Sequence, residues 1–275
     1  MTSTVLITGA SSGFGLASAT LFLARGWNVI ATMRSPRPAL FDAGDRLLVT
    51  ALDVTDPTSI DNAVSEGIAR FGQIDVLVNN AGVGLFGALE ATADEVIRQV
   101  FETNTFGVMA TTRAIVAHLR ERGSGTIVNV TSSVTIAPMP LVAAYAASKS
   151  AIEGFSESLA HELLPFGVRV RIVEPGLAPS TSFAANSNHS ADALIPAAYA
   201  AFAERYLGSM REYPTAYTTG EDVADAVYAA ATDQGDRLRW PAGADSAMLA
   251  ELRQSLSEQA FMARMRAMFG GAPVR

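Results

Sequence analysis

The chain has 275 residues, and a hydrophobic share of 49% against a charged share of 17% is enough to form a sizeable buried core, which argues against intrinsic disorder. Its net charge of −7 at pH 7 argues against a nucleic-acid-binding surface, because phosphate binding needs clustered Lys and Arg. The absence of cysteine excludes disulfides, thiolate catalysis and cysteine-based zinc sites.

No stretch approaches the roughly 18 uninterrupted apolar residues of a membrane span, and the amino terminus lacks the basic region of a signal peptide. We therefore expect a cytoplasmic protein without a membrane partner. The length suits one α/β domain over residues 1–275 better than two small domains.

Strand-like and helix-like segments alternate from the start of the chain. In chain order, the patterns predict a strand over 4–8, a helix over about 14–25, strands over 28–32 and 47–52, a helix over 56–71, a strand over 75–79, a helix over 92–117, a strand over 126–130, a helix over 144–164, a strand over 168–173, a helix from 219 and a last strand over 237–240. Thr92-x-x-Glu95 matches a capping box, and Thr219-x-x-Asp222 is expected to open the later helix.

Repeated strand–helix–strand units with short connections predict an α/β fold, with a doubly wound parallel sheet and helices on both faces. Ligands of such sheets bind beyond the carboxyl ends of the strands, where the strand order reverses. Residues 178–218 are too long for an ordinary connection, so we expect a substrate lid with a short helix around 196–208. A C-terminal extension at about 245–270 is expected to form one helix from Asp245 to Phe269.

The first predicted strand leads into Thr8-Gly9-Ala10-Ser11-Ser12-Gly13-Phe14-Gly15 and then a helix. Glycines let the backbone turn sharply and approach a pyrophosphate, and the free N–H groups of the helix attract its negative charge. A tight turn that uses glycine for geometry alone is the other interpretation. The position of the turn after the first strand of an alternating α/β chain favours nucleotide binding.

Tyr145 and Lys149 are four residues apart, which places both side chains on one face of the predicted helix. A free phenol, with a pKa of about 10, exchanges its proton too rarely near neutral pH. A neighbouring ammonium favours the phenolate and lowers that pKa, so that Tyr145 could act as a general acid or base. Taken alone, the pair could also share a helix by chance.

The spacing Gly9-x-x-x-Gly13-x-Gly15 resembles that of the short-chain dehydrogenase/reductase family, and further segments extend the resemblance over roughly residues 4–180. These segments are Asp53-Val54, Asn79-Asn80-Ala81-Gly82, Asn104, Ser132, Tyr145-x-x-x-Lys149 and Pro175-Gly176. The resemblance implies a Rossmann-like sheet of seven strands in the order 3-2-1-4-5-6-7, a nicotinamide dinucleotide cofactor, a small-molecule carbonyl or alcohol substrate, and a homodimer or homotetramer.

The resemblance also implies a role for each of four residues. Tyr145 would give a proton to the carbonyl oxygen as hydride arrives, and take it back in the oxidative direction. Lys149 would bind the nicotinamide ribose and lower the pKa of Tyr145, Ser132 would hydrogen-bond the substrate oxygen, and Asn104 would hold a water. Ser132 lies 13 residues before Tyr145, the interval usual in the family, and Ser133 remains the alternative.

The residues expected to contact the cofactor follow the ends of the strands. They are Gly9, Ser11, Ser12, Gly13, Phe14, Gly15, Arg34, Asp53, Val54, Asn79, Asn80, Ala81, Gly82, Tyr145, Lys149, Pro175, Gly176, Ala178 and Ser180. Ser180 stands where the family usually has a threonine that contacts the nicotinamide amide, and Thr181 is the alternative. Glu174 replaces the asparagine that more commonly precedes Pro175.

The choice of cofactor depends on the end of the second strand, Ala31-Thr32-Met33-Arg34. NAD-preferring relatives place an acidic residue there, and this chain has none. The guanidinium of Arg34 suits a phosphate through paired hydrogen bonds, so NADP(H) is expected in preference to NAD(H). The other interpretation is an exposed arginine without a function.

The sequence thus predicts an NADP(H)-dependent oxidoreductase that interconverts a hydrophobic ketone or aldehyde and its alcohol. The expected substrate-facing residues are mostly apolar: Leu85, Phe86, Ile136, Pro138, Met139, Leu141 and Phe183. A dehydratase or epimerase of the extended relatives fits the length and glycine spacing less well. A catalytically silent NADP(H)-binding regulatory protein would not need the intact proton donor. The three histidines lack metal-ligand spacing, so no metal is expected.

Overall fold

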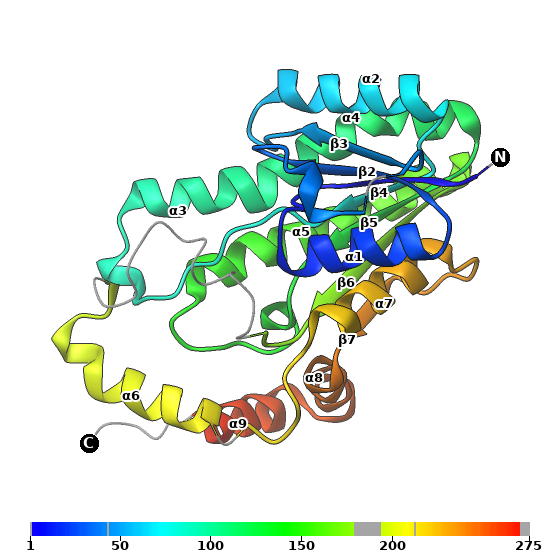
Figure 1. Cartoon of the computed structure of the whole chain (residues 1–275). Coiled ribbons are helices and arrows are strands. Elements are labelled where there is room, and N and C mark those ends of the chain that lie inside the picture. Colours follow the sequence, from blue (N-terminus) through cyan, green and yellow to red (C-terminus); the bar gives the residue numbers. More distant parts are fainter. Residues whose placement is uncertain (1, 43, 179–193, 212, 270–275) are drawn as a thin grey trace.

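Seven parallel strands form the sheet at the centre of the fold, in the order β3-β2-β1-β4-β5-β6-β7 (Figure 1). The computed structural model describes residues 2–42, 44–178, 194–211 and 213–269. The strands are β1 (Thr4–Ile7), β2 (Asn28–Met33), β3 (Leu47–Ala51), β4 (Val76–Asn79), β5 (Gly125–Val130), β6 (Val168–Pro175) and β7 (Arg239–Ala242). The strand order reverses at β1, which pairs with β2 on one side and β4 on the other. The predicted fold class and strand order are therefore confirmed.

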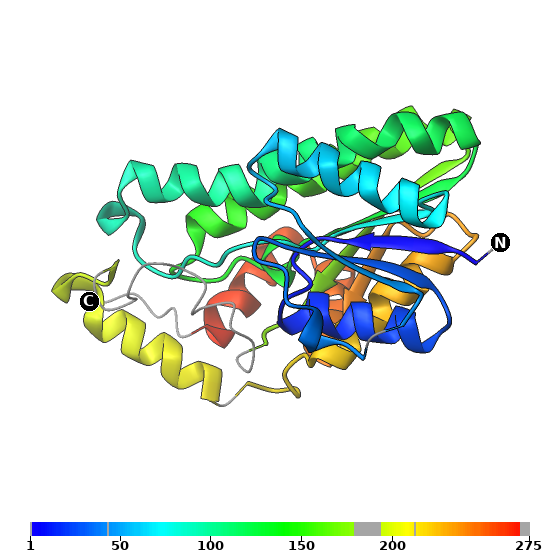
Figure 2. The same ribbon diagram turned by 45° about the horizontal axis from the view of Figure 1, so that its top comes forward.

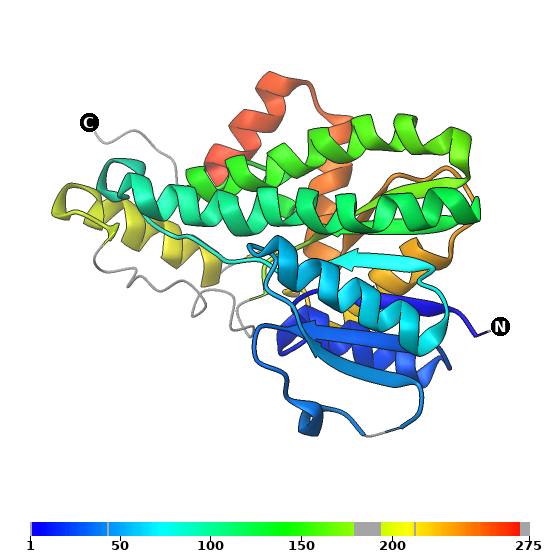
Figure 3. The same ribbon diagram turned by 90° about the horizontal axis from the view of Figure 1, so that it is seen from above.

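Helices cover both faces of the sheet, because the strands are apolar on both sides. On one face lie α1 (Gly13–Ala24) and α7 (Gly220–Thr232), and on the other α2 (Pro57–Phe71), α4 (Gly107–Arg122) and α5 (Ala143–Leu163) (Figures 1 and 3). Each face closes over its own apolar cluster, the first including Phe22, Val223 and Val227, and the second Ile60, Ile115 and Leu159. Both Gly26, just after the first helix, and the capping box of Thr219 and Asp222 are where the sequence predicts them.

The helix predicted over 92–117 is instead broken into three parts. α3 (Asp94–Phe101) and α4 are joined by a π-helical turn over Glu102–Phe106. The predicted capping box at Thr92 is wrong: α3 begins after Ala93, and Thr92 Oγ1 donates to Ala88 O at 2.9 Å because a 3₁₀ turn precedes the helix. Turns of the π type are rare and concentrate at functional sites, and this one contains Asn104.

The C-terminal extension forms two helices where one was predicted. α8 (Ala244–Ser255) ends at Leu256, whose backbone is extended, and Ser257 then caps α9 (Glu258–Met268) by accepting from Ala260 N at 3.3 Å. The break lets Leu249, Phe261, Met265 and Phe269 all reach one apolar cluster.

β7 begins two residues later than predicted. It lies at the edge of the sheet, where Pro241 is tolerated because an edge strand leaves one side of its backbone unpaired. Leu238, which the prediction placed inside the strand, still accepts a hydrogen bond from Ile172 N at 2.8 Å.

α6 (Ala197–Arg211) lies beyond the carboxyl ends of the strands, on the side of the molecule away from the N-terminus (Figure 2). The predicted helix over 196–208 is therefore present and longer. Tyr206 of α6 stacks on Phe86 at 6.2 Å between ring centroids and meets Phe269 edge-on at 6.0 Å. These contacts join the loop after β4, α6 and the C-terminal extension into one apolar layer.

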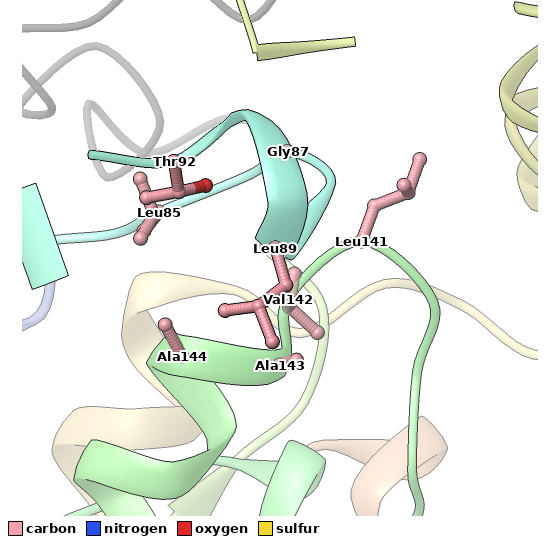
Figure 4. Close-up of a pocket in the computed structure, with 8 residues that line it drawn as sticks. All are labelled: Leu85, Gly87, Leu89, Thr92, Leu141, Val142, Ala143 and Ala144. Atoms are coloured by element: carbon pink, nitrogen blue, oxygen red, sulfur yellow. The ribbon is translucent and has the colours of Figure 1, made fainter. Parts of the chain in front are cut away.

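Two segments, 85–92 after β4 and 141–144 at the start of α5, line a small, mostly apolar pocket (Figure 4). Gly87 N donates to Leu141 O at 2.7 Å, and Ala88 N donates to Leu194 O at 2.8 Å. Leu141 has a positive φ of 60°, a conformation that costs a non-glycine residue about 1–2 kcal/mol. Because Leu141 immediately precedes Val142 and α5, this kinked backbone sets the direction in which α5 begins.

One buried carboxylate, that of Asp245, joins both ends of the segment between β6 and α7. Asp245 is fully buried; Oδ2 accepts from Leu177 N at 2.6 Å and Oδ1 from Thr218 Oγ1 at 2.6 Å. Thr218 N also donates to Leu177 O at 2.9 Å. A Cβ on Gly176 would overlap the Asp245 carboxylate, so only glycine fits there. Leu177 and Thr218 are thus held side by side.

Candidate active site

A cavity of about 1090 Å³ extends from the turn after β1, across the carboxyl ends of the central strands, to α6. This is the location that the strand-order rule predicts. Most of the predicted site residues line it: Gly9, Ser11, Ser12, Gly13, Phe14, Arg34, Asp53, Val54, Asn80, Ala81, Gly82, Ser132, Tyr145, Lys149, Pro175, Gly176 and Ala178. Gly15, Asn79 and Asn104 lie behind the wall, and Ser180 and Thr181 fall outside the described residues.

The glycines of the first turn are there for close backbone packing as well as for shape. Gly9 and Gly13 have positive φ angles of 70° and 52°. Gly15 faces the Gly9 carbonyl and the Asn80 amide so closely that a Cβ would overlap both. α1 begins at Gly13 without a side-chain cap, so the N–H groups of its first turn remain available to an anion.

The segment after β4 holds this turn in place. Asn80 Nδ2 donates to Thr8 O at 2.9 Å, and Thr8 Oγ1 accepts from both Asn80 N and Ala81 N at 3.0 Å. Asn79 points into the interior instead, where Nδ2 donates to Thr112 Oγ1 at 3.0 Å and to Asn129 Oδ1 at 2.9 Å. Asn79 therefore ties strands to helix, and it does not reach the cavity.

The acidic residue after β3 is bound locally. Asp53 Oδ1 accepts from Thr55 N at 2.9 Å and from Thr55 Oγ1 at 2.7 Å, while Asp53 N donates to Ser59 Oγ at 3.0 Å. These hydrogen bonds fix the turn after β3, in which Leu52, Asp53 and Val54 line the cavity.

Two arginines line the cavity after β2, where the sequence suggested one. Arg34 and Arg37 are both exposed, and Arg37 Nη2 donates to Ser11 O at 3.0 Å across the mouth of the first turn. Arg37 was missed because it lies three positions after Arg34, beyond the end of the strand. The signal was the absence of any helix or strand pattern between Ser35 and Pro38, which lets the chain turn back.

Tyr145 and Ser132 form a hydrogen-bonded pair at the deep end of the cavity. Tyr145 is 6% exposed, and burial raises the pKa of its phenol well above 10, an effect that the hydrogen bond with Ser132 only partly opposes. The sequence-based expectation of a lowered pKa is therefore not met, because desolvation dominates. Among the described residues, the buried Ser133 Oγ has no hydrogen-bond partner and does not line the cavity, so the geometry favours Ser132.

Lys149 lies one turn after Tyr145 on α5, with its ammonium turned towards β5. Its Nζ donates to Val130 O at 2.9 Å, and the side chain is nearly fully buried. Burial lowers the pKa of Lys149 to about 8, and the carboxylate of Glu153 acts in the opposite direction. Nζ also faces Gly82, where a Cβ would come close to it.

Asn104 is fully buried in the π-helical turn, and its side chain binds protein on every side. Oδ1 accepts from Val83 N at 2.8 Å, and Nδ2 donates to Val83 O at 2.9 Å and to Ser148 Oγ at 3.1 Å. The side chain thus fixes the loop after β4 against α5.

The end of the cavity near α6 is apolar. Its walls include Leu85, Phe86, Val134, Met139, Val142, Leu177, Tyr206, Leu207 and Met210. Of the predicted substrate-facing residues, Leu85, Phe86 and Met139 line this cavity, whereas Ile136 and Pro138 do not, and Leu141 lines the smaller pocket of Figure 4. Phe183 falls outside the described residues. The α6 residues were missed because nothing in their sequence marks them as facing a ligand.

Within the described ranges, no group of three or more His, Cys, Asp or Glu side chains is arranged to hold a metal ion. Over the same part of the chain, no helix combines the length and apolarity needed to cross a membrane.

Comparisons with known proteins agree with this geometry. A family model described as short chain dehydrogenase matches residues 3–192. The uncharacterized oxidoreductase YusZ of Bacillus subtilis is 38% identical over 248 residues, which cover 86% of this chain and 88% of that protein.

Solved structures match over nearly the whole chain. A short-chain dehydrogenase from Streptomyces avermitilis superposes with a TM-score of 0.78 at 33% identity, covering 100% of this chain and 99% of that one. One from Burkholderia cenocepacia, in complex with NADP, does so with a TM-score of 0.75 at 28% identity, covering 96% and 97%. Similar structures include complexes with NADP and complexes with NADH. Fold, cavity and sequence lead to the same conclusion: the chain belongs to the short-chain dehydrogenase family of oxidoreductases.

Proposed function

We propose that the protein is an NADP(H)-dependent oxidoreductase that interconverts a hydrophobic ketone or aldehyde and the corresponding alcohol. The observation that carries the proposal is the hydrogen-bonded pair of Ser132 and Tyr145, which faces the same cavity as the glycine-rich turn and Arg34. Tyr145, Ser132, the glycine-rich turn and Arg34 thus line one cavity.

The residues of the cavity fit a nicotinamide dinucleotide phosphate. The turn leaves no room for a Cβ at Gly9 or Gly15, and α1 begins without a side-chain cap, so its first N–H groups suit a pyrophosphate. Arg34 offers a guanidinium to a ribose phosphate at the exposed end. Lys149, at the buried end, would bind the nicotinamide ribose. The bound cofactor supplies the hydride equivalent.

The chain's own residues supply the proton and hold the carbonyl. Because burial keeps the pKa of Tyr145 above 10, its phenol is protonated at neutral pH and can donate to the developing alkoxide. Ser132 hydrogen-bonds the same oxygen and thereby stabilises its negative charge. In the reverse direction Tyr145 must first lose its proton, and the resulting phenolate then accepts the proton of the alcohol. The apolar wall from Phe86 to Met210 favours a hydrophobic substrate and excludes water.

A cofactor-oxidation assay tests this function. NADPH and NADH are offered separately, with a panel of bulky ketones and aldehydes, and absorbance is followed at about 340 nm, where reduced nicotinamide absorbs. Turnover that prefers NADPH supports the proposal. NADPH binding without turnover across a broad panel would instead favour the catalytically silent regulatory protein. Turnover with NADH alone would contradict the proposed preference for NADP(H).

Replacing Arg34 with Ala should weaken NADPH binding about tenfold and leave NADH binding nearly unchanged. A charged hydrogen bond to phosphate contributes roughly 1.5–3 kcal/mol, and the exposure of Arg34 places it at the low end. Both dissociation constants can be measured by nicotinamide fluorescence titration. Arg46→Ala, which removes an exposed arginine away from the cavity, is the matched control for net charge. Equal losses for both cofactors would remove the phosphate-binding role of Arg34.

A further inference from the structure

Directly behind the turn that carries Ser132, three carboxylates surround one arginine. Arg239 Nη2 lies 2.8 Å from Glu153 Oε2 and 2.8 Å from Glu157 Oε1, and its Nε lies 3.7 Å from Glu174 Oε1. Glu153 is 8% exposed and Glu174 3%. A carboxylate is costly to bury, and the catalytic scheme above uses neither of these two.

Glu153 is held against the catalytic turn by two threonine hydroxyls, one on each side of Ser132. Thr131 Oγ1 donates to Glu153 Oε1 at 2.6 Å. Thr135 Oγ1 lies 3.2 Å from the same oxygen and 2.7 Å from Ser132 O, so its single proton is shared between the carboxylate and the turn. With Oε2 bound by Arg239, both oxygens of Glu153 are fixed.

Glu153 is also one helical turn after Lys149 on α5, a spacing at which side chains are neighbours. Lys149 Nζ donates to the carbonyl oxygen of Val130, and Val130 is next to Thr131. The ammonium and the carboxylate are therefore hydrogen-bonded to adjacent residues at the end of β5. Burial favours the neutral amine, and Glu153 is the group that raises the pKa of Lys149 against this effect. Lys149 is the only lysine among the 275 residues.

We propose that Glu153 is a positioning residue for the reaction, which holds the turn carrying Ser132 through Thr131 and Thr135 and keeps Lys149 cationic. Glu153 touches neither of the groups that meet the substrate, and acts only through its neighbours. The inference rests on the proposed role of Lys149 in the site.

The charges around Glu153 come from every element packed on it. Lys149 and Glu157 lie on α5, Glu174 on β6 and Arg239 on β7, with Arg237 just before β7. Burial, and then the charge of Glu153, raise the pKa of Glu174 to about 7. Arg239 offsets part of this repulsion. Glu153 is thus the member of the cluster that faces the catalytic residues, and Glu157 is the exposed member that faces away from them.

The test is a direct titration of Lys149 by NMR in protein labelled with ¹³C,¹⁵N-lysine, because a single lysine gives a single side-chain signal. Glu153→Gln keeps an oxygen that can accept from the threonines but removes the charge. It should lower the titration midpoint of Lys149 by about one pH unit. Glu157→Gln, which removes a carboxylate bound to the same arginine, should leave the midpoint unchanged. An unchanged midpoint in Glu153→Gln would overturn the proposal.

Glu153→Asp separates charge from packing, and it also serves if the Gln variant does not fold. Since Asp keeps the charge, the titration midpoint of Lys149 should stay close to its wild-type value. A fall in this midpoint as large as that in Glu153→Gln would overturn the electrostatic role. In the reductive reaction, loss of the Lys149 charge as pH rises gives an alkaline limb, which should move to lower pH in Glu153→Gln and stay in place in Glu157→Gln. The NMR titration needs no substrate, so its failure is distinct from failure of the proposed function.

Discussion

Replacing Tyr145 with Phe should reduce carbonyl turnover by at least about 100-fold while leaving NADPH affinity nearly unchanged. Proton transfer by a positioned side chain contributes roughly 10²–10⁴-fold, and Phe keeps the ring that fills the cavity wall but removes the proton. Ser132 loses its hydrogen bond with the phenol in this variant, and we do not expect Ser132 alone to replace Tyr145 as the proton donor. Steady-state turnover and a fluorescence titration with NADPH measure the two quantities separately.

Tyr206→Phe is the matched control for this experiment. Tyr206 lines the same cavity and is also buried, yet it lies on α6, against Phe86, in the apolar part. Removing its hydroxyl should change turnover by only a few-fold, through substrate fit. If Tyr145→Phe retained wild-type turnover, the phenol would not be the proton donor and the catalytic scheme would fail.

Replacing Gly15 with Ala should lower the free energy of unfolding by about 1–3 kcal/mol and weaken NADPH binding by at least about tenfold. A Cβ at this position would overlap the Gly9 carbonyl oxygen and the Asn80 amide, which are backbone and a bonded side chain and cannot easily move. The turn would have to open, and the first N–H groups of α1 would lose their position. Urea unfolding and cofactor titration measure the two effects.

Gly154→Ala is the matched control, a glycine-to-alanine change that should raise the free energy of unfolding instead of lowering it. Gly154 lies in α5 with open space where a Cβ would be, so alanine should stabilise the helix by about 0.5–1 kcal/mol. A stable Gly15→Ala protein with normal NADPH affinity would show that the close packing of the first turn is not required.

The part of the site that could be predicted from the sequence consists of characteristic residue types that directly follow predicted strands or lie at a fixed spacing on a predicted helix. Buried parallel strands are short apolar runs, and ligand-binding residues follow their carboxyl ends, so Gly13, Asn80, Ser132 and Tyr145 could be placed without coordinates. The spacing of four between Tyr145 and Lys149 likewise placed both on α5.

What could not be predicted depends on contacts between distant parts of the chain. The π-helical turn at Asn104 is stabilised by Val83 and Ser148, neither of which is local to it. The approach of Arg37 to Ser11 needs the loop after β2 to fold back. The raised pKa of Tyr145 comes from the near-complete burial of its side chain, which depends on the whole fold and which no local sequence pattern encodes.

Asp245 joins the two ends of the segment that carries α6. This segment starts at Leu177, just after β6, and ends at Thr218, just before α7, and these two residues are hydrogen-bonded to each other and to one carboxylate. For a loop whose ends are already joined, doubling its length costs only about 0.6 kcal/mol of closure entropy. Insertions, deletions and wholesale replacement between these two points can therefore change what enters the cavity while the sheet and the first turn stay as they are.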